Sequence, residues 1–171
     1  MARGSALDQA GKHPRVREFL KQLRTLYADV RTWLPHELRI REDTKNLHEE
    51  AFGQYEAPAL RITQADGSAI ATLEPVGASI IGAKARVDLK GSADVQPILY
   101  LLKGGPVFEI TVTSTAGGFP DQRVAPVFKG VTTDGWYWVD GKRPRQAHPL
   151  DRDAFLKLLR FTADYGEAQP A

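Results

Sequence analysis

The stretch that decides the fold class is RVDLKGSADVQPILYLLKGGPVFEITVT, residues 86–113. Apolar and polar residues alternate in Arg86–Lys90 and again from Phe108, which is typical of strands with one buried face. Between them, Ile98–Leu102 is continuously apolar and rich in residues that favour strands, as expected of a central strand. Lys103–Gly105 has the composition of a hairpin turn. We therefore predict that these segments pair as an antiparallel meander.

Further strands are predicted on both sides of this stretch, so that the sheet has about six strands. Period-two alternation and flanking turn residues place them at residues 60–63, 69–74, 79–81 and 136–139. Residues 36–57 are ambiguous, since Leu38–Arg41 alternates like a short strand whereas Lys45–Phe52 could form a short helix. Residues 115–130 contain several glycines and prolines and predict a long loop, whose apolar side chains either pack down or contact a partner.

Two amphipathic helices are predicted at the ends of the strand region. From Arg15 to Leu34, apolar residues recur at steps of three and four, and Pro14 suits the first helical position. From Arg152 to Tyr165 a second apolar stripe follows Asp151, whose carboxylate is a favourable N-cap. The sequence therefore predicts an α+β fold in which both helices pack on one face of the sheet.

Composition indicates one globular domain. The chain has 171 residues, of which 42% are hydrophobic and 26% charged. We expect a single domain over residues 15–166 with flexible tails at 1–14 and 167–171. The absence of cysteine excludes disulfides and thiol nucleophiles and favours a reducing compartment. The longest apolar runs are too short to span a bilayer, so we expect a cytoplasmic protein without membrane contact.

Glu74, Asp88 and Lys90 form the first candidate site. Asp88 and Lys90 share one face of a strand because strand side chains alternate. An acidic residue upstream of such a pair resembles the metal site of the PD-(D/E)xK nucleases. The resemblance implies that the two carboxylates hold Mg²⁺ and that the lysine orients the attacking water. The alternative is a solvated polar face with an ion pair, which fits the strand, rather than a helix, predicted after Lys90.

Other catalytic chemistries lack a motif. The four histidines show no metal-ligand spacing, the serines form no nucleophile elbow, and no glycine-rich segment has the frame of a phosphate-binding loop. We therefore predict no metal and no cofactor.

The second candidate site is a binding surface around the last predicted strand. Trp136 and Trp138 share one strand face, and Arg143, Arg145 and His148 follow in a basic loop. Aromatic residues beside arginine are typical of protein-binding hot spots, and they also stack on nucleic acids. The net charge of only +2 favours a protein partner over nucleic acid. The alternative is that the aromatic rings pack into the core and the loop is solvated.

Two functions follow from these sites. The favoured one is a small intracellular, non-enzymatic interaction or accessory module that binds a protein partner. The alternative is a metal-dependent nuclease of the PD-(D/E)xK type that uses Glu74, Asp88 and Lys90.

Overall fold

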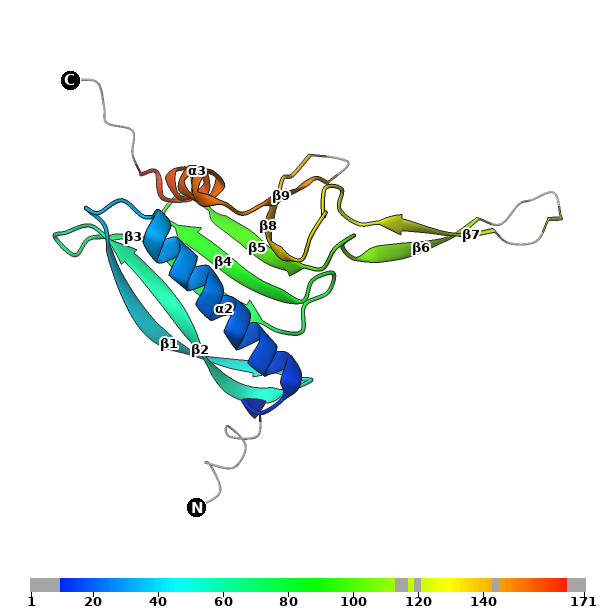
Figure 1. The fold of residues 1–171 in the computed structure, drawn as a ribbon, viewed down its shortest axis with the longest axis horizontal. Helices are drawn as coiled ribbons and strands as arrows, with labels where there is room; N and C mark the ends of the chain where they lie inside the picture. Colours follow the sequence, from blue (N-terminus) through cyan, green and yellow to red (C-terminus); the bar gives the residue numbers. More distant parts are fainter. Residues whose placement is uncertain (1–9, 113–116, 119–120, 143–144, 166–171) are drawn as a thin grey trace, which may run out of the picture.

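The computed structural model describes residues 10–112, 117–118, 121–142 and 145–165, and it confirms the predicted α+β fold. A seven-stranded antiparallel sheet has the order β1-β2-β3-β4-β5-β8-β9, and a long helix precedes the strands while a shorter one follows them (Figure 1). The elements are α2 (Pro14–Trp33), β1 (Arg39–Glu49), β2 (Gly53–Thr63), β3 (Ala69–Gly77), β4 (Ala85–Gly91), β5 (Val95–Leu101), β6 (Val107–Val112), β7 (Asp121–Pro126), β8 (Gly135–Val139), β9 (Ala147–Pro149) and α3 (Arg152–Ala163).

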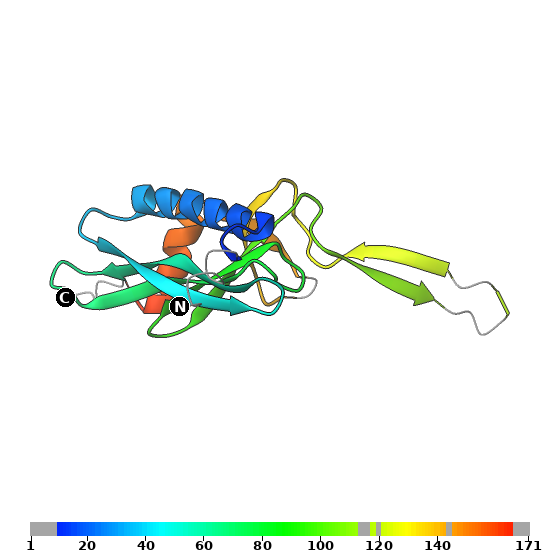
Figure 2. The ribbon, with the colours of Figure 1, turned by 90° about the horizontal axis from the view of Figure 1, so that it is seen from below.

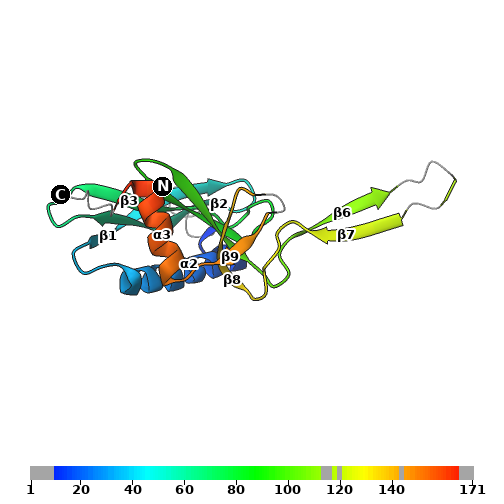
Figure 3. The ribbon, with the colours of Figure 1, turned by 90° about the horizontal axis from the view of Figure 1, so that it is seen from above.

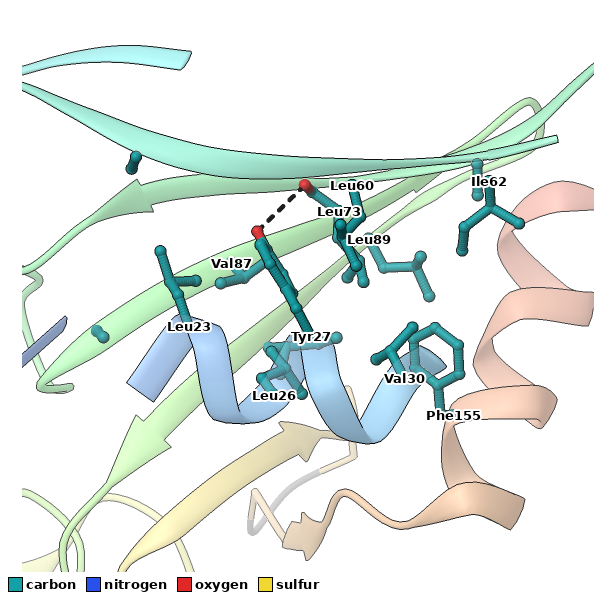
Figure 4. Packing of buried hydrophobic residues seen from close by; sticks show 14 of the residues in the cluster. Leu23, Leu26, Tyr27, Val30, Leu60, Ile62, Leu73, Val87, Leu89 and Phe155 are labelled. Carbon is teal, nitrogen blue, oxygen red and sulfur yellow. Dashed lines mark hydrogen bonds between the residues drawn. The ribbon is translucent and has the colours of Figure 1, made fainter. Parts of the chain in front are cut away.

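The main core lies between the sheet and the helices. Figure 2 shows α2 lying along one face of the sheet, and α3 closes the core at the end of the strands. Figure 4 shows the side chains of Leu23 and Val30 from α2 and Phe155 from α3 meeting Val87 and Leu89 of β4. All five are fully buried. The helices therefore form because the sheet covers their apolar stripes, as the spacing predicts.

Local signals fix both helix starts. Pro14 occupies the first turn of α2, where its missing N–H costs no hydrogen bond. The Asp151 carboxylate accepts a hydrogen bond from the Ala154 N–H at 2.8 Å, which confirms the predicted N-cap of α3. Asp164, in the left-handed conformation at φ 50°, ends α3. The predicted tails fall largely outside the described residues.

The sixth strand in the chain leaves the sheet. β6 forms where alternation predicts a strand, but it pairs with β7 rather than β5, from Val107 opposite Pro126 to Val112 opposite Asp121. The place beside β5 is taken by β8, whose Trp138 lies opposite Ile98. Figure 3 shows β6 and β7 projecting from the rest of the molecule as a two-stranded ribbon, which we call the ribbon.

Several predictions of local structure are wrong, because tertiary pairing overrides them. No helix forms over Lys45–Phe52: residues 45–49 are the end of β1, which pairs with β2 over its whole length, and residues 50–52 form the turn between the two strands. Residues 79–81 form no strand, since the chain turns there and Ile81 is fully exposed. The long loop predicted over residues 115–130 contains β7, and the basic loop before α3 contains β9.

A smaller core lies on the other face of the sheet. Tyr137 alternates with its two tryptophan neighbours, so its ring points away from the helices and packs with Leu101 and Ala147. Phe128, which follows β7, covers this cluster and is buried. Part of the predicted loop therefore packs down, while the ribbon that precedes it projects.

Candidate interaction surfaces

The predicted nuclease residues do lie together, as parts of an ion-pair network on the sheet. Glu74 of β3 faces Asp88 of β4 across the ladder. The Glu74 carboxylate accepts hydrogen bonds from Lys90 Nζ at 2.8 Å and Lys45 Nζ at 3.1 Å. The Lys90 hydrogen bond, followed by Lys45, holds the pKa of Glu74 below its ordinary value, and the same contact raises the pKa of Lys90.

Asp88 is held by a separate cation. Arg86 Nε and Nη2 donate to its two carboxylate oxygens at 2.7 and 3.1 Å. Both acidic side chains are therefore neutralised by cations of the same chain. Within the part of the chain that the structure describes, no group of three or more histidine, aspartate or glutamate side chains is placed to hold a metal ion. Asp88 is buried, with an exposed fraction of 7%, and the predicted nuclease role of these residues stays a prediction.

Trp136 and Trp138 lie on the helix-facing side of β8, half-buried against the main core. Trp136 Nε1 donates to the carbonyl of Gln22 on α2 at 3.3 Å, and the Trp136 ring meets Tyr100 edge to face. The Trp138 ring stacks on His148, with 4.4 Å between ring centroids. The shared face of the two tryptophans is as predicted, and both rings pack against the main core.

The basic residues of the same segment differ in their surroundings. His148 Nε2 lies 3.1 Å from a carboxylate oxygen of Asp140, and this contact is the main reason that the pKa of Asp140 is below its ordinary value. Arg145 is exposed, and its carbonyl accepts a hydrogen bond from the Lys129 N–H. Arg143 lies outside the described residues. The predicted binding role of this segment stays a prediction.

The ribbon carries apolar side chains that the body of the protein does not cover. Val107, Phe108, Ile110, Val112 and Val124 have exposed fractions of 60, 47, 39, 48 and 64%. Alternation places Phe108, Ile110 and Val112 on one face, which we call the ribbon stripe. An exposed row of large apolar residues on a projecting element is typical of an interaction surface.

The charges of the ribbon lie mostly on β7. Arg123 Nε donates to the Asp121 carboxylate at 2.8 Å, and the register puts this ion pair beside Ile110 and Val112 on the same face. β6 contributes a single charged residue, Glu109, on the opposite face. The ribbon is thus nearly uncharged along β6 and polar along β7.

A surface cavity of about 380 Å³ opens at the root of the ribbon. Pro106, just before β6, lines it together with Arg15 of α2 and Lys84. Arg15 Nη2 donates to the Ala78 carbonyl at 2.9 Å, which holds this side chain at the cavity. A molecule that lies along the ribbon and reaches its root would meet two cationic side chains there.

The sequence predicts strand β6 of the ribbon but not the exposure of its apolar face. The alternation of Phe108, Ile110 and Val112 predicts one buried face, and the sequence contains no signal that this face stays open. Within the described residues, no helix is both long enough and apolar enough to cross a membrane. Comparisons of the chain with protein-family models, with curated proteins and with solved structures find no match to any of them.

Proposed function

We propose that this protein is a non-enzymatic interaction module that binds a protein partner, and that the ribbon is its main contact element. The observation that supports the proposal is the ribbon stripe, three large apolar side chains that each stay more than a third exposed on an element projecting from the body. An isolated two-stranded ribbon is marginally stable in water. A partner that covers the stripe would stabilise the ribbon and remove its apolar surface from water.

Charge favours a protein over nucleic acid as the partner. Strands β6 and β7 hold two acidic residues, Glu109 and Asp121, and one basic residue, Arg123. Binding to nucleic acid depends on lysine and arginine side chains that neutralise phosphates. A ribbon with one arginine, already paired with an aspartate, lacks that chemistry.

The segment 136–148 remains a second contact within this proposal. Arg143 and Arg145 would supply charge that speeds association, while the ribbon supplies the apolar anchor, since Trp136 and Trp138 are packed against the core. Changing both arginines to alanine is expected to leave the melting temperature unchanged and to slow association. That slowing should shrink at high salt, because salt screens exposed charges.

The proposal is tested by weakening the ribbon stripe. The variant Phe108→Thr/Ile110→Thr/Val112→Thr keeps residue types that suit a strand and removes the apolar contact. The matched control, Ile81→Thr/Val95→Thr, changes two exposed apolar residues outside the ribbon. Each protein is used to capture partners from an extract of the native host, and the captured partner is then purified.

Calorimetry with the purified partner gives the decisive result. The ribbon variant is expected to bind at least about tenfold more weakly, the effect of losing an apolar hot spot. The control variant is expected to bind as the unchanged protein does. Equal affinity of all three proteins would contradict the proposal.

A further inference from the structure

The open edge of β6 is defined by the pairing at its root. The Val127 N–H donates to the Pro106 carbonyl at 2.8 Å, so this pair is a hydrogen-bonded position of the ladder. Such positions alternate along antiparallel strands. The N–H and C=O groups of Val107, Glu109 and Thr111 therefore point away from β7. Within the described residues, no strand pairs with this edge of β6.

The two edges of the ribbon are not equivalent. By the same alternation, Gln122, Val124 and Pro126 of β7 point away from β6. Pro126 has no N–H to donate, and proline on an outer edge is a common protection against pairing with another strand. The outward-pointing positions of β6 contain no proline. The β7 edge therefore carries a proline that opposes strand addition, whereas the β6 edge carries none and can accept a strand.

The side chains of β6 match a second copy of β6 in one antiparallel register. If Ile110 faces Ile110 of the second copy, Phe108 faces Val112 and Glu109 faces Thr111. The two ribbon stripes then form one apolar face of six residues. This register also pairs the outward-pointing backbone groups of Glu109 with those of Thr111.

Neighbouring registers are less favourable. A shift that brings Phe108 opposite Ile110 also sets Glu109 directly opposite Glu109, and like charges in that position are destabilising. A slip by one residue turns one stripe to the opposite face. The shift in the other direction pairs Phe108 with residue 114, beyond the end of β6. Only the register centred on Ile110 combines apolar, charge and backbone complementarity.

We infer that the protein forms a two-fold symmetric dimer in which β6 pairs with β6 of a second copy, Ile110 opposite Ile110. This inference rests on the proposed function of the ribbon as a contact element. Pairing converts two marginal ribbons into one four-stranded antiparallel sheet. The interface is closed, since the same edge serves both copies. The new outer edges are the β7 edges, where Pro126 opposes further addition of strands.

Cysteine substitution tests the register directly, because the natural chain has no cysteine. In Ile110→Cys, the two cysteines of a dimer face each other at about 4.5–5.5 Å between Cα atoms, within reach of a disulfide. The matched control is Arg123→Cys, the β7 neighbour of Ile110 on the same face. Its copies would be three strand spacings apart, about 14 Å, which is too far. A third variant, Glu109→Cys, reports the register that sets Glu109 opposite itself.

The full-length variants are oxidised under mild conditions and resolved by non-reducing electrophoresis. The expected result is a covalent dimer for Ile110→Cys and mostly monomer for Arg123→Cys and Glu109→Cys. Preferential cross-linking of Glu109→Cys or Arg123→Cys would overturn the inferred pairing.

Sedimentation equilibrium of the unmodified chain supplies a second measurement. We expect a concentration-dependent dimer, which Thr111→Pro weakens at least about tenfold by removing an outward-pointing N–H. Gln122→Pro makes the same change on the β7 edge and should leave the dimer intact. A chain that stays monomeric and does not cross-link through Ile110→Cys overturns the inference. In that case the proposed function is tested separately, by the affinity of the ribbon variant for a partner that is a different protein.

Discussion

The strands β4 and β6 have the same alternating pattern and opposite surroundings. Val87 and Leu89 of β4 are fully buried, whereas Phe108 and Ile110 of β6 have exposed fractions of 47 and 39%. β4 lies between two strands of the sheet and under the helices, while β6 pairs with β7 alone among the described residues. Alternation therefore specifies a strand with one apolar face, and the neighbouring elements decide whether that face is covered.

The helices account for the difference. Leu23 of α2 and Phe155 of α3 pack over β4, and Tyr27 Oη donates to the Pro58 carbonyl at 2.9 Å, which ties α2 to the sheet. No described helix lies over the ribbon in any view (Figures 1 and 3). A mutation of an apolar residue should therefore have a large effect on the stability of the body and a small effect in the ribbon.

The largest effect is expected from truncating a helix residue of the main core. Leu23→Ala should lower the free energy of unfolding by about 2–5 kcal/mol, because it leaves a cavity where a fully buried side chain was. Leu158→Ala on α3 should cost a similar amount. Urea denaturation of each variant gives the measurement, with Ile110→Ala as the ribbon control. Midpoints that hardly move for Leu23→Ala would contradict the packing of α2 on the sheet.

A smaller loss of stability is expected at Gly91 of β4, where the backbone of α3 packs closely against the strand. A Cβ added at Gly91 would lie 2.2 Å from the carbonyl oxygen of Thr162 and 2.6 Å from the Cα of Ala163, both in α3. Gly91→Ala should therefore push α3 from the end of β4 and cost about 1–3 kcal/mol. At Gly141 an added Cβ meets no atom within 4 Å, so Gly141→Ala is the matched control. Equal thermal stability of the two variants would show that α3 is not fixed there.

The ion pairs of Glu74 with Lys90 and Lys45 should contribute less to stability, and their contribution should depend on pH. The pKa of Glu74 lies below its ordinary value of 4.5, chiefly because of Lys90. The ionised Glu74 side chain therefore stabilises the fold fully above pH 4.5. This stabilisation is lost as the pH falls through the pKa of Glu74 in the folded protein, which is lower than 4.5. Glu74→Gln should cost up to about 1 kcal/mol near neutral pH, as exposed ion pairs do.

The check for Glu74 is a denaturation series at decreasing pH. The difference in unfolding free energy between the unchanged protein and Glu74→Gln should shrink as the medium becomes acidic. Glu109→Gln on the ribbon is the control and should differ from the unchanged protein by less than about 0.5 kcal/mol at every pH. If the difference in unfolding free energy for Glu74→Gln instead grows on acidification, the expected direction of the pH dependence is wrong.

The features that sequence predicts correctly are local ones. The N-cap at Asp151 and the stripe of α2 depend on residues within a few positions of one another, so spacing is sufficient to find them. The order of β2 to β5 follows from short hairpins between neighbouring strands. The fold class is accordingly confirmed.

The features that sequence misses depend on contacts between distant residues. Lys45 reaches Glu74 across 29 positions, and Trp136 finds the Gln22 carbonyl across 114. No periodicity in either segment reveals these contacts. The departure of β6 has the same origin, because β8 occupies the place beside β5 that β6 would fill in a simple meander. The exposure of the ribbon stripe therefore cannot be inferred from the sequence, because it depends on which elements pack over each strand.

The smallest effect on the stability of the monomer is expected in the ribbon. The variant Phe108→Thr/Ile110→Thr/Val112→Thr changes three large apolar residues. In the monomer these side chains have exposed fractions of 39 to 48%, and no described helix covers them, so in dilute solution each substitution should change the free energy of unfolding by about 0.5 kcal/mol or less. At high concentration a dimer adds a binding term to the stability, and this term should be larger for the unchanged chain, because the threonine variant lacks the apolar cross-strand pairs. Melting temperatures should therefore lie close together in dilute solution and separate as concentration rises. A loss above about 2 kcal/mol at the lowest concentration would mean that the ribbon stripe is covered within one chain, and the contrast between β4 and β6 would fail.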